Sequence, residues 1–198
     1  MSIVICPGMH EPKLTQDFLG GLRREIAVGF GSLLSDGINS RPTENLLIFP
    51  AQDAPAYSAW HILQFLRDRI SSPLESSVVF ISFSAGVVGA IGAAWGWQLL
   101  GGQVKAFIAL DGWGVPLFGN FSIHRLSHDY FTQWSSSALG SGKDGFYADP
   151  PVEHLELWRS PQNVAGWWVH PNVGKSIPDT HLTAAQFLTM LLERYGEL

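Results

Sequence analysis

The sequence has little charge, a single cysteine and no excess of basic residues. Only 15% of its 198 residues are Asp, Glu, Lys or Arg, whereas typical soluble domains have about 25%. A formal net charge of −5 argues against a nucleic-acid binder, which usually carries a basic stripe. The lone Cys6 excludes an internal disulfide and a zinc site built from several cysteines. The hydrophobic fraction of 46% excludes a disordered chain, and the length predicts one domain over 1–198.

One long stretch has no charge at all, because no Asp, Glu, Lys or Arg occurs between Glu75 and Lys105. A single helix of this length would cross a bilayer. The stretch instead begins with the β-branched and aromatic run 78–81, passes through small residues, and only then becomes rich in alanine and glycine. We therefore expect a strand, a turn and a helix, with no integral membrane span. No signal-peptide pattern is visible at the start of the chain, so the expected location is the cytoplasm.

Short apolar runs alternate with segments of helical period along the chain. Strands are predicted over 3–6, 46–49, 78–81, 104–110 and 166–169. Helices are predicted over 14–28, 58–70, 86–100, about 150–159 and 184–195, the last with a capping box at Thr183 and Gln186. This alternation implies right-handed crossovers and a mostly parallel sheet buried on both faces. The predicted fold class is α/β, a three-layer α/β/α sandwich.

The segment 78–89 combines an apolar strand, Ser82-Phe83-Ser84-Ala85-Gly86 and a helix of small residues. A nucleophile elbow has this layout, since it holds a serine on a strained strand-to-helix turn with small neighbours. The usual pattern is G-x-S-x-G, and Ser82 replaces its first glycine. Ser84 is therefore the predicted nucleophile, and an ordinary tight turn is the alternative.

A serine hydroxyl needs a base to remove its proton. His181 is the predicted base, because it lies just before the last helix and could reach the strand ends. His170, after the last predicted strand, is the alternative. Four other histidines are assigned to surfaces, to packing or to the irregular segment 115–150: His61, His124, His128 and His154.

A third group must orient the imidazole and stabilise its charged form. Asp111 directly follows the strand 104–110, at the carboxyl edge where parallel sheets gather their ligand sites. It is the predicted acid, with a solvated turn or a helix cap as the alternative. Asp179 is so close to His181 in sequence that an orienting hydrogen bond would be awkward.

The predicted oxyanion hole combines the backbone N–H groups of Ala85, at the start of a helix, and of Met9, in the loop after the first strand. Most of the eight tryptophans are explained by core packing. Trp113 lies two residues after the predicted acid and could line an apolar pocket. The predicted substrate-binding residues are His10, which could instead cap the next helix, and Trp113, Phe118 and Phe121.

Two glycine–lysine pairs do not support a nucleotide site. Gly174-Lys175-Ser176 lacks the leading glycine of a P-loop, and Pro178 opposes the helix that should follow. Gly142-Lys143 lacks both the leading glycine and the hydroxyl residue after lysine. The histidines show no metal-ligand spacing, so no metal and no other cofactor are expected.

Together these residues resemble the α/β-hydrolase superfamily, and more closely its small members. The resemblance covers 3–110 and 166–195. It implies a serine hydrolase with Ser84 as nucleophile, His181 as base and an oxyanion hole at Met9 and Ala85. The acid commonly follows a later strand in this family, but some members carry it where Asp111 stands. Residues 115–150 would correspond to the cap or lid that sets substrate preference.

The sequence thus predicts hydrolysis of a small, fairly apolar carboxylic ester or thioester through an acyl-enzyme on Ser84. A catalytically inactive, hydrolase-like binding or scaffold protein is the alternative, because Ser82 departs from the motif. The expected partner is a small-molecule substrate and not a nucleic acid. The oligomeric state is left open.

Overall fold

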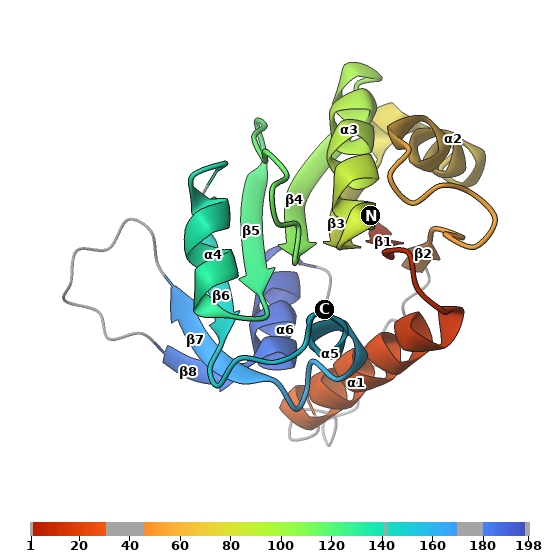
Figure 1. The fold of residues 1–198 in the computed structure, drawn as a ribbon. Coiled ribbons are helices and arrows are strands. Elements are labelled where there is room, and N and C mark those ends of the chain that lie inside the picture. The colour runs from red at the N-terminus through yellow and green to blue at the C-terminus, as the bar shows by residue number, and fades with distance from the viewer. Residues whose placement is uncertain (1, 31–45, 141, 170–179, 197–198) are drawn as a thin grey trace.

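The computed structural model describes residues 2–30, 46–140, 142–169 and 180–196 (Figure 1). The strands are β1 (Ser2–Cys6), β2 (Leu46–Ile48), β3 (Ser77–Phe83), β4 (Gln103–Leu110), β5 (Ser122–Ser127), β6 (Asp144–Ala148), β7 (Ala165–Val169) and β8 (Thr180–Thr183). The helices are α1 (Pro12–Phe30), α2 (Ala59–Arg69), the 3₁₀ helix η2 (Pro73–Glu75), α3 (Ala85–Leu99), α4 (Tyr130–Ser137), α5 (His154–Arg159) and α6 (Ala184–Arg194).

All the described strands belong to one sheet in the order β2-β1-β3-β4-β5-β6-β7-β8. Neighbouring strands from β2 to β6 pair in parallel. β7 pairs antiparallel with both β6 and β8. The predicted α/β fold with a mostly parallel sheet is therefore confirmed.

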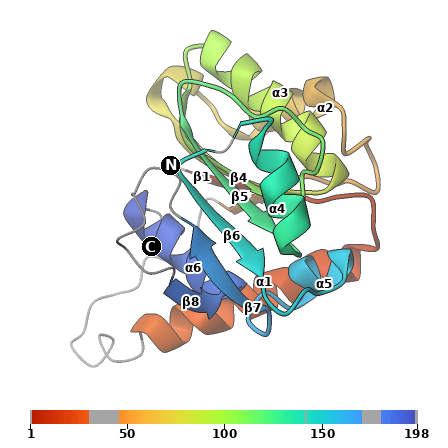
Figure 2. The same cartoon turned by 60° about the vertical axis from the view of Figure 1, so that its left-hand side comes forward.

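Helices cover both faces of this sheet: α2, α3 and α4 lie on one side, and α1, α5 and α6 on the other (Figure 2). Side chains of a strand point alternately to the two faces. In β1, for example, Ile3 and Ile5 join the hydrophobic cluster that includes residues of α1 and α6. Val4 and Cys6 join the second cluster, which includes residues of α2 and α3. The arrangement is a three-layer sandwich with a core on each side of the sheet.

The uncharged stretch between Glu75 and Lys105 forms β3 and α3. β3 is buried from Val78 to Phe83 between β1 and β4. Glycines of α3 let it pack closely on α2 and the turn before it, because a Cβ at Gly89 would lie 2.4 Å from the Ala56 carbonyl oxygen. Among the described residues, no helix is both long and apolar enough to span a membrane.

The order of the strands creates a switch point between β1 and β3. From β1 the chain moves outward to β2, then returns across β1 to β3 and continues to β4 on the other side. The loops after β1 and β3 therefore leave the sheet side by side at its carboxyl edge, where open α/β sheets bind ligands. Ser84 follows β3, and Gly8 lies in the loop after β1.

Residues 115–150 contribute two strands of the central sheet, so this segment does not form the expected cap. β5 pairs with β4, β6 pairs with β5, and α4 joins them. Their buried positions include polar side chains, which hid the strand pattern in the sequence. Arg125, only 2% exposed, donates hydrogen bonds to the carbonyl oxygens of Gly140 (2.6 Å), Val115 (3.0 Å) and Leu139 (3.2 Å).

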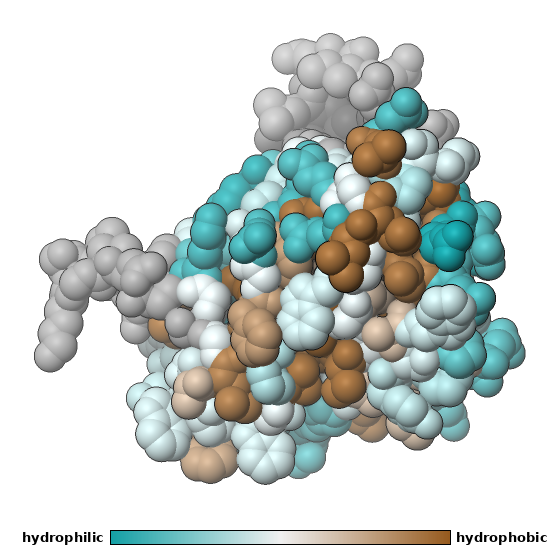
Figure 3. All heavy atoms as spheres, turned by 90° about the horizontal axis from the view of Figure 1, so that it is seen from above, coloured by the Kyte–Doolittle hydropathy of each residue, from teal (hydrophilic) through white to brown (hydrophobic). Residues whose placement is uncertain are grey.

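Large hydrophobic side chains are also exposed away from the carboxyl edge. Figure 3 views the molecule from the side of the amino ends of β3 and β4 and shows hydrophobic patches among polar residues. Leu74, which precedes β3, and Leu99, which precedes β4, are 79% and 88% exposed. Exposed apolar surface alone therefore does not identify a functional face of this molecule.

Candidate active site

Ser84 occupies a strained turn between β3 and α3. Its backbone has φ 53° and ψ −125°, a conformation that only a minority of non-glycine residues adopt. The turn is tightly enclosed, since a Cβ at Gly86 would lie 2.3 Å from the Cys6 carbonyl oxygen. A Cβ at Gly8 would lie 2.9 Å from the Cβ of Ser84. The turn is therefore not an ordinary βα connection, and the small residues around it are required by close packing.

His154 is the histidine beside Ser84. Its Nε2 lies 3.0 Å from Ser84 Oγ, and its Nδ1 lies 2.8 Å from Asp111 Oδ2. An ionised carboxylate only accepts hydrogen bonds, so Nδ1 carries the proton and Nε2 is free to accept the hydroxyl hydrogen. The ring stacks on Phe83 with a centroid separation of 4.7 Å. These contacts fix both the tautomer and the orientation of the imidazole.

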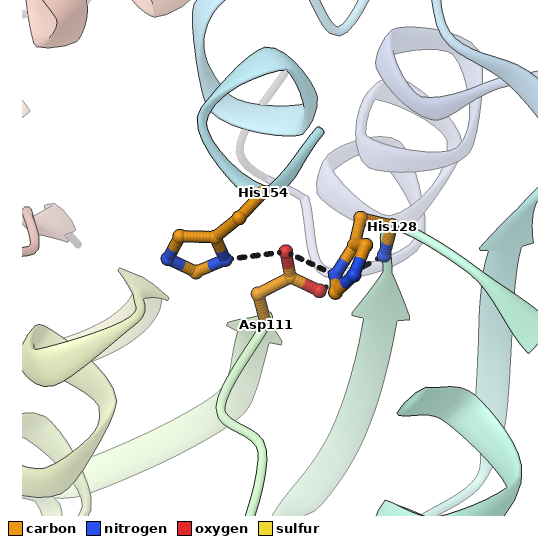
Figure 4. Close-up of side chains that lie close together, drawn as sticks. All are labelled: Asp111, His128 and His154. Carbon is orange, nitrogen blue, oxygen red and sulfur yellow. Dashed lines mark hydrogen bonds and ion pairs between the residues drawn. The ribbon is translucent and has the colours of Figure 1, made fainter. Parts of the chain in front are cut away.

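Asp111 follows β4 and is 5% exposed. Its backbone is in the left-handed region with φ 50°, and its N–H donates to the Leu126 carbonyl oxygen at 2.8 Å. Oδ2 accepts from His154, and Figure 4 shows His154 and His128 on opposite sides of the carboxylate. Burial alone would raise the pKa of this carboxyl. The hydrogen bonds from His128 and His154 lower it by more, so the pKa lies below its ordinary value.

His128, just after β5, is a second histidine on the same carboxylate. Its Nδ1 lies 2.9 Å from Asp111 Oδ2, and its backbone N–H donates to Asp111 Oδ1 at 2.9 Å. Its Nε2 lies 3.8 Å from Asp129 Oδ2. The hydrogen bond to Asp111 raises the pKa of His128 above its ordinary value against the opposing effect of burial. No pattern in the sequence pairs this histidine with Asp111.

His181 does not approach Ser84. It lies in β8, at the far end of the sheet from β3, with β4 to β7 between them. Its ring is exposed and packs edge-on against Trp167 at 4.9 Å. His170 lies outside the described residues. The structure thus brings Ser84 and Asp111 together, as predicted, but through His154.

The missed histidine has a local explanation. The predicted helix start at Pro150 places His154 inside a helix, in a packing or surface position. Pro150 precedes a second proline, Pro151, and a residue before proline is disfavoured in the helical region. The helix α5 accordingly begins at His154 itself. The Pro-Pro pair was the available signal that His154 stands at a helix start.

A cavity of about 540 Å³ opens over Ser84. Its other lining residues come from α3, α4, α5 and the loops after β4 and β5: Ala85, Val88, Asp111, Trp113, Val115, His128, Asp129, Phe131, Thr132 and His154. Trp113 lines this cavity, as predicted. Phe118 instead stacks on Trp95 at 5.5 Å, and Phe121 lines a separate cavity of about 440 Å³ with Lys105 and Tyr195.

His10 and the predicted oxyanion donors lie around the same edge. His10 does not line the cavity, and its ring contacts Phe83 at 5.7 Å and Trp158 at 6.1 Å. Ala85 is the first residue of α3, where helical N–H groups have no acceptor within the helix. Met9 follows Gly8, which packs against Ser84. The role of these two amides stays a prediction.

The donor atoms of Asp111, His128 and His154 lie within 4.8 Å of one another. In the part of the chain that the structure describes, they are the group close enough to share one ion. Both imidazole Nδ1 atoms, however, already lie at hydrogen-bonding distance from one carboxylate oxygen. Hydrogen bonds therefore account for this cluster, and we assign no metal to it.

No protein-family model matches the chain, and no curated protein matches it either. The site is therefore defined by its own geometry. That geometry consists of a strained serine, a histidine bonded to it and a buried carboxylate bonded to the histidine, at the edge of a solvent-accessible cavity.

Proposed function

We propose that this chain is a serine hydrolase of the α/β-hydrolase kind, acting on a small, apolar, uncharged carboxylic ester or thioester. The observation that supports it most is the unbroken hydrogen-bonded line from Ser84 Oγ through His154 to Asp111. The nucleophile, base and orienting acid of such an enzyme need this geometry. Their chain order, serine, aspartate, histidine, is also that of nucleophile-elbow enzymes.

In the first half-reaction, Ser84 Oγ attacks the carbonyl carbon of the substrate while its proton moves to His154 Nε2. The imidazolium that forms is stabilised by the Asp111 carboxylate on its other nitrogen. The tetrahedral intermediate then collapses and its C–O or C–S bond breaks. His154 Nε2 returns the proton to the departing alcohol or thiol, and the acyl group stays on Ser84.

In the second half-reaction, water replaces the alcohol or thiol. His154 Nε2 takes one proton from the water while its oxygen attacks the acyl carbonyl carbon. Collapse of this second intermediate breaks the bond to Ser84 Oγ, which recovers the proton from His154. The carboxylic acid leaves, and the residues return to their starting protonation states.

Both tetrahedral intermediates place negative charge on the former carbonyl oxygen. We assign its stabilisation to the N–H groups of Ala85 and Met9. Ala85 begins α3, so its amide lies at the positive end of the helix dipole. Loss of one such donor lowers the rate by about 10²–10³-fold in other hydrolases.

The cavity supports the proposed substrate class. Five apolar side chains line it, namely Ala85, Val88, Trp113, Val115 and Phe131. No lysine or arginine is among its described lining residues, and His128, whose pKa is raised, is already paired with the carboxylates of Asp111 and Asp129. This lining therefore does not favour an anionic substrate. A neutral acyl group or alcohol suits this lining best.

An inactive binding protein has less support. Ser82, the departure that raised this alternative, is fully buried, and its hydroxyl donates to the Ile108 carbonyl oxygen at 3.2 Å. A serine is therefore accommodated at this position, beside a strained Ser84. A binding protein would also have no need of a serine held within hydrogen-bonding distance of an oriented imidazole.

The deciding experiment is labelling of the purified protein with a fluorophosphonate, which reacts only with an activated serine. We expect an adduct on Ser84 that is absent from Ser84→Ala. His154→Gln should label at least about 10³-fold more slowly, because the base is lost.

His181→Gln is the matched control. It changes a histidine of the same kind at an exposed position in β8, so it should label like the wild type. Undiminished labelling of Ser84→Ala would contradict the proposed nucleophile. A loss in His181→Gln as large as that in His154→Gln would contradict the proposed base.

A further inference from the structure

We propose that His128 is a positioning residue of this site: it clamps the Asp111 carboxylate in the orientation that holds the His154 imidazole toward Ser84. The inference rests on the proposed function, since it concerns the efficiency of the same serine, histidine and aspartate. The inference adds His128, which is bonded to Asp111, as a fourth residue beside Ser84, His154 and Asp111.

The clamp consists of two hydrogen bonds from one residue to both oxygens of one carboxylate. The backbone N–H of His128 donates to Asp111 Oδ1, and its Nδ1–H donates to Oδ2, both at 2.9 Å. Oδ2 also accepts the Nδ1–H of His154 at 2.8 Å. With both oxygens held, the carboxylate cannot rotate away from His154 without breaking a bond to His128.

The clamp is anchored by the sheet. β4 and β5 pair in register at Leu110 and Leu126, and the Asp111 N–H donates to the Leu126 carbonyl oxygen. His128 follows two residues later, where β5 ends. The distance between His128 and Asp111 is thus fixed by two neighbouring strands and does not depend on a mobile loop. Such support from rigid elements is what precise positioning of a catalytic group requires.

His128 does not touch the reacting atoms. Its Nδ1 is bonded to Asp111, and its Nε2 is directed toward Asp129, 3.8 Å away. The nitrogen bonded to Ser84 Oγ belongs to His154. His128 therefore acts through Asp111 and is not an alternative base.

The charges around His128 favour its protonated form. It is faced by Asp111 after β4, by Asp129 before α4 and by Glu153 before α5, and each of these carboxylates raises its pKa. His154 of α5 faces it edge-on, with ring centroids 6.0 Å apart. The protonated form carries a hydrogen on both ring nitrogens, so the Nδ1–H stays available to Asp111 Oδ2.

The test compares His128→Asn and His128→Ala with the wild type, using kcat and KM for a neutral p-nitrophenyl ester between pH 5 and 9. The Asn amide can supply an N–H in place of Nδ1–H but carries no charge. We expect kcat at the alkaline plateau to fall about tenfold or more in His128→Ala, with a smaller change in KM. His128→Asn should recover much of this loss.

An unchanged kcat in His128→Ala would overturn the positioning role of His128. An Asn variant no better than Ala would overturn the clamp.

Failure of the proposed function is separate, because it shows as unchanged turnover in Ser84→Ala alone. Thermal unfolding of each variant identifies a misfolded protein before its kinetics are interpreted.

Discussion

At the scale of single residues, Asp111 shows how a strained backbone and one carboxylate organise several side chains. Its φ of 50° turns the chain sharply after β4 and points the side chain back over the sheet edge. Asp and Asn adopt this conformation more readily than most residues, because their short polar side chains can bond locally. The side chain is almost fully buried, and yet both of its oxygens have partners. An aspartate therefore suits both the left-handed backbone at this position and the role of a buried hydrogen-bond acceptor.

We predict that Asp111→Asn lowers kcat for a neutral ester by about 10³–10⁴-fold while the protein stays folded. Asn fits the left-handed backbone, but its amide cannot stabilise the His154 imidazolium and favours the wrong tautomer. Turnover and thermal unfolding are measured side by side. Asp17→Asn, on the exposed surface of α1, is the control and should behave like the wild type. Near-wild-type turnover of Asp111→Asn would assign the orienting role to another group.

Sequence reasoning identified Ser84 and Asp111 because each directly follows a buried strand at the carboxyl edge of the sheet. A strand end is visible in sequence, since an apolar run stops there. The base is different, because its position depends on where the chain returns to the site from a distance. His154 reaches Ser84 from α5, 70 positions later, and only the Pro150-Pro151 pair indicated that it starts a helix. His128 could not be foreseen, since its pairing depends on the register of β5 against β4.

At the scale of elements, β5 and β6 show why part of the sheet was hidden. The first four strands are almost wholly apolar where they are buried, so their pattern was readable. β5 instead contains the buried His124 and Arg125, which make hydrogen bonds to partners outside the strand, Nε2 of His124 with Tyr195 and Nε of Arg125 with the Gly140 carbonyl oxygen. Burial of a charged side chain is tolerated only when such partners exist, and these partners are fixed by tertiary structure. A polar strand in the middle of a sheet therefore looks like a loop in the sequence.

We predict that Arg125→Met lowers the free energy of unfolding by about 2–4 kcal/mol, because it removes a buried guanidinium that donates to three carbonyl oxygens. Of these, Leu139 keeps the Leu117 N–H as a donor, whereas Val115 and Gly140 lose the bond from Arg125. Burial lowers the pKa of Arg125 to about 10, so the native guanidinium is still charged at neutral pH. Urea unfolding measures the change. Arg159→Met, which removes an exposed pair with Glu156, is the control and should cost less than about 0.5 kcal/mol. Equal losses in the two variants would contradict the role assigned to Arg125.

At the scale of the whole molecule, the sheet both builds the site and joins the last helix to the core. The switch point between β1 and β3 accounts for the place of Ser84, and it could be anticipated from the alternation of strands and helices. The arrangement of the far half of the sheet could not be anticipated, because β7 runs antiparallel to both of its neighbours, β6 and β8. That half also carries a buried polar network. His124 of β5 bonds Tyr195, after α6, through Nε2 at 2.8 Å, and Asp144 of β6 contacts Arg194 of α6.

This network predicts how the stability of the whole protein depends on pH. Burial lowers the pKa of His124 to about 4, although the nearby Asp144 raises it. Between about pH 6.5, the ordinary value for histidine, and pH 4, the unfolded chain binds a proton that the folded protein excludes. The free energy of unfolding should therefore fall as the pH falls through this window, with a slope of up to about 1.4 kcal/mol per unit. His128, with its raised pKa, acts in the opposite sense and loses its stabilising effect as the pH rises above 6.5.

Urea unfolding between pH 4 and 8 separates these contributions. His124→Gln cannot titrate, so its stability should depend less on pH between 6.5 and 4, whatever the substitution costs at neutral pH. His181→Gln changes an exposed histidine of β8 and should keep the wild-type slope. If His124→Gln kept that slope as well, the acid sensitivity would have another source. A flattened slope in His124→Gln alone would identify the contacts between the sheet and the end of α6 as the source of the destabilisation at low pH.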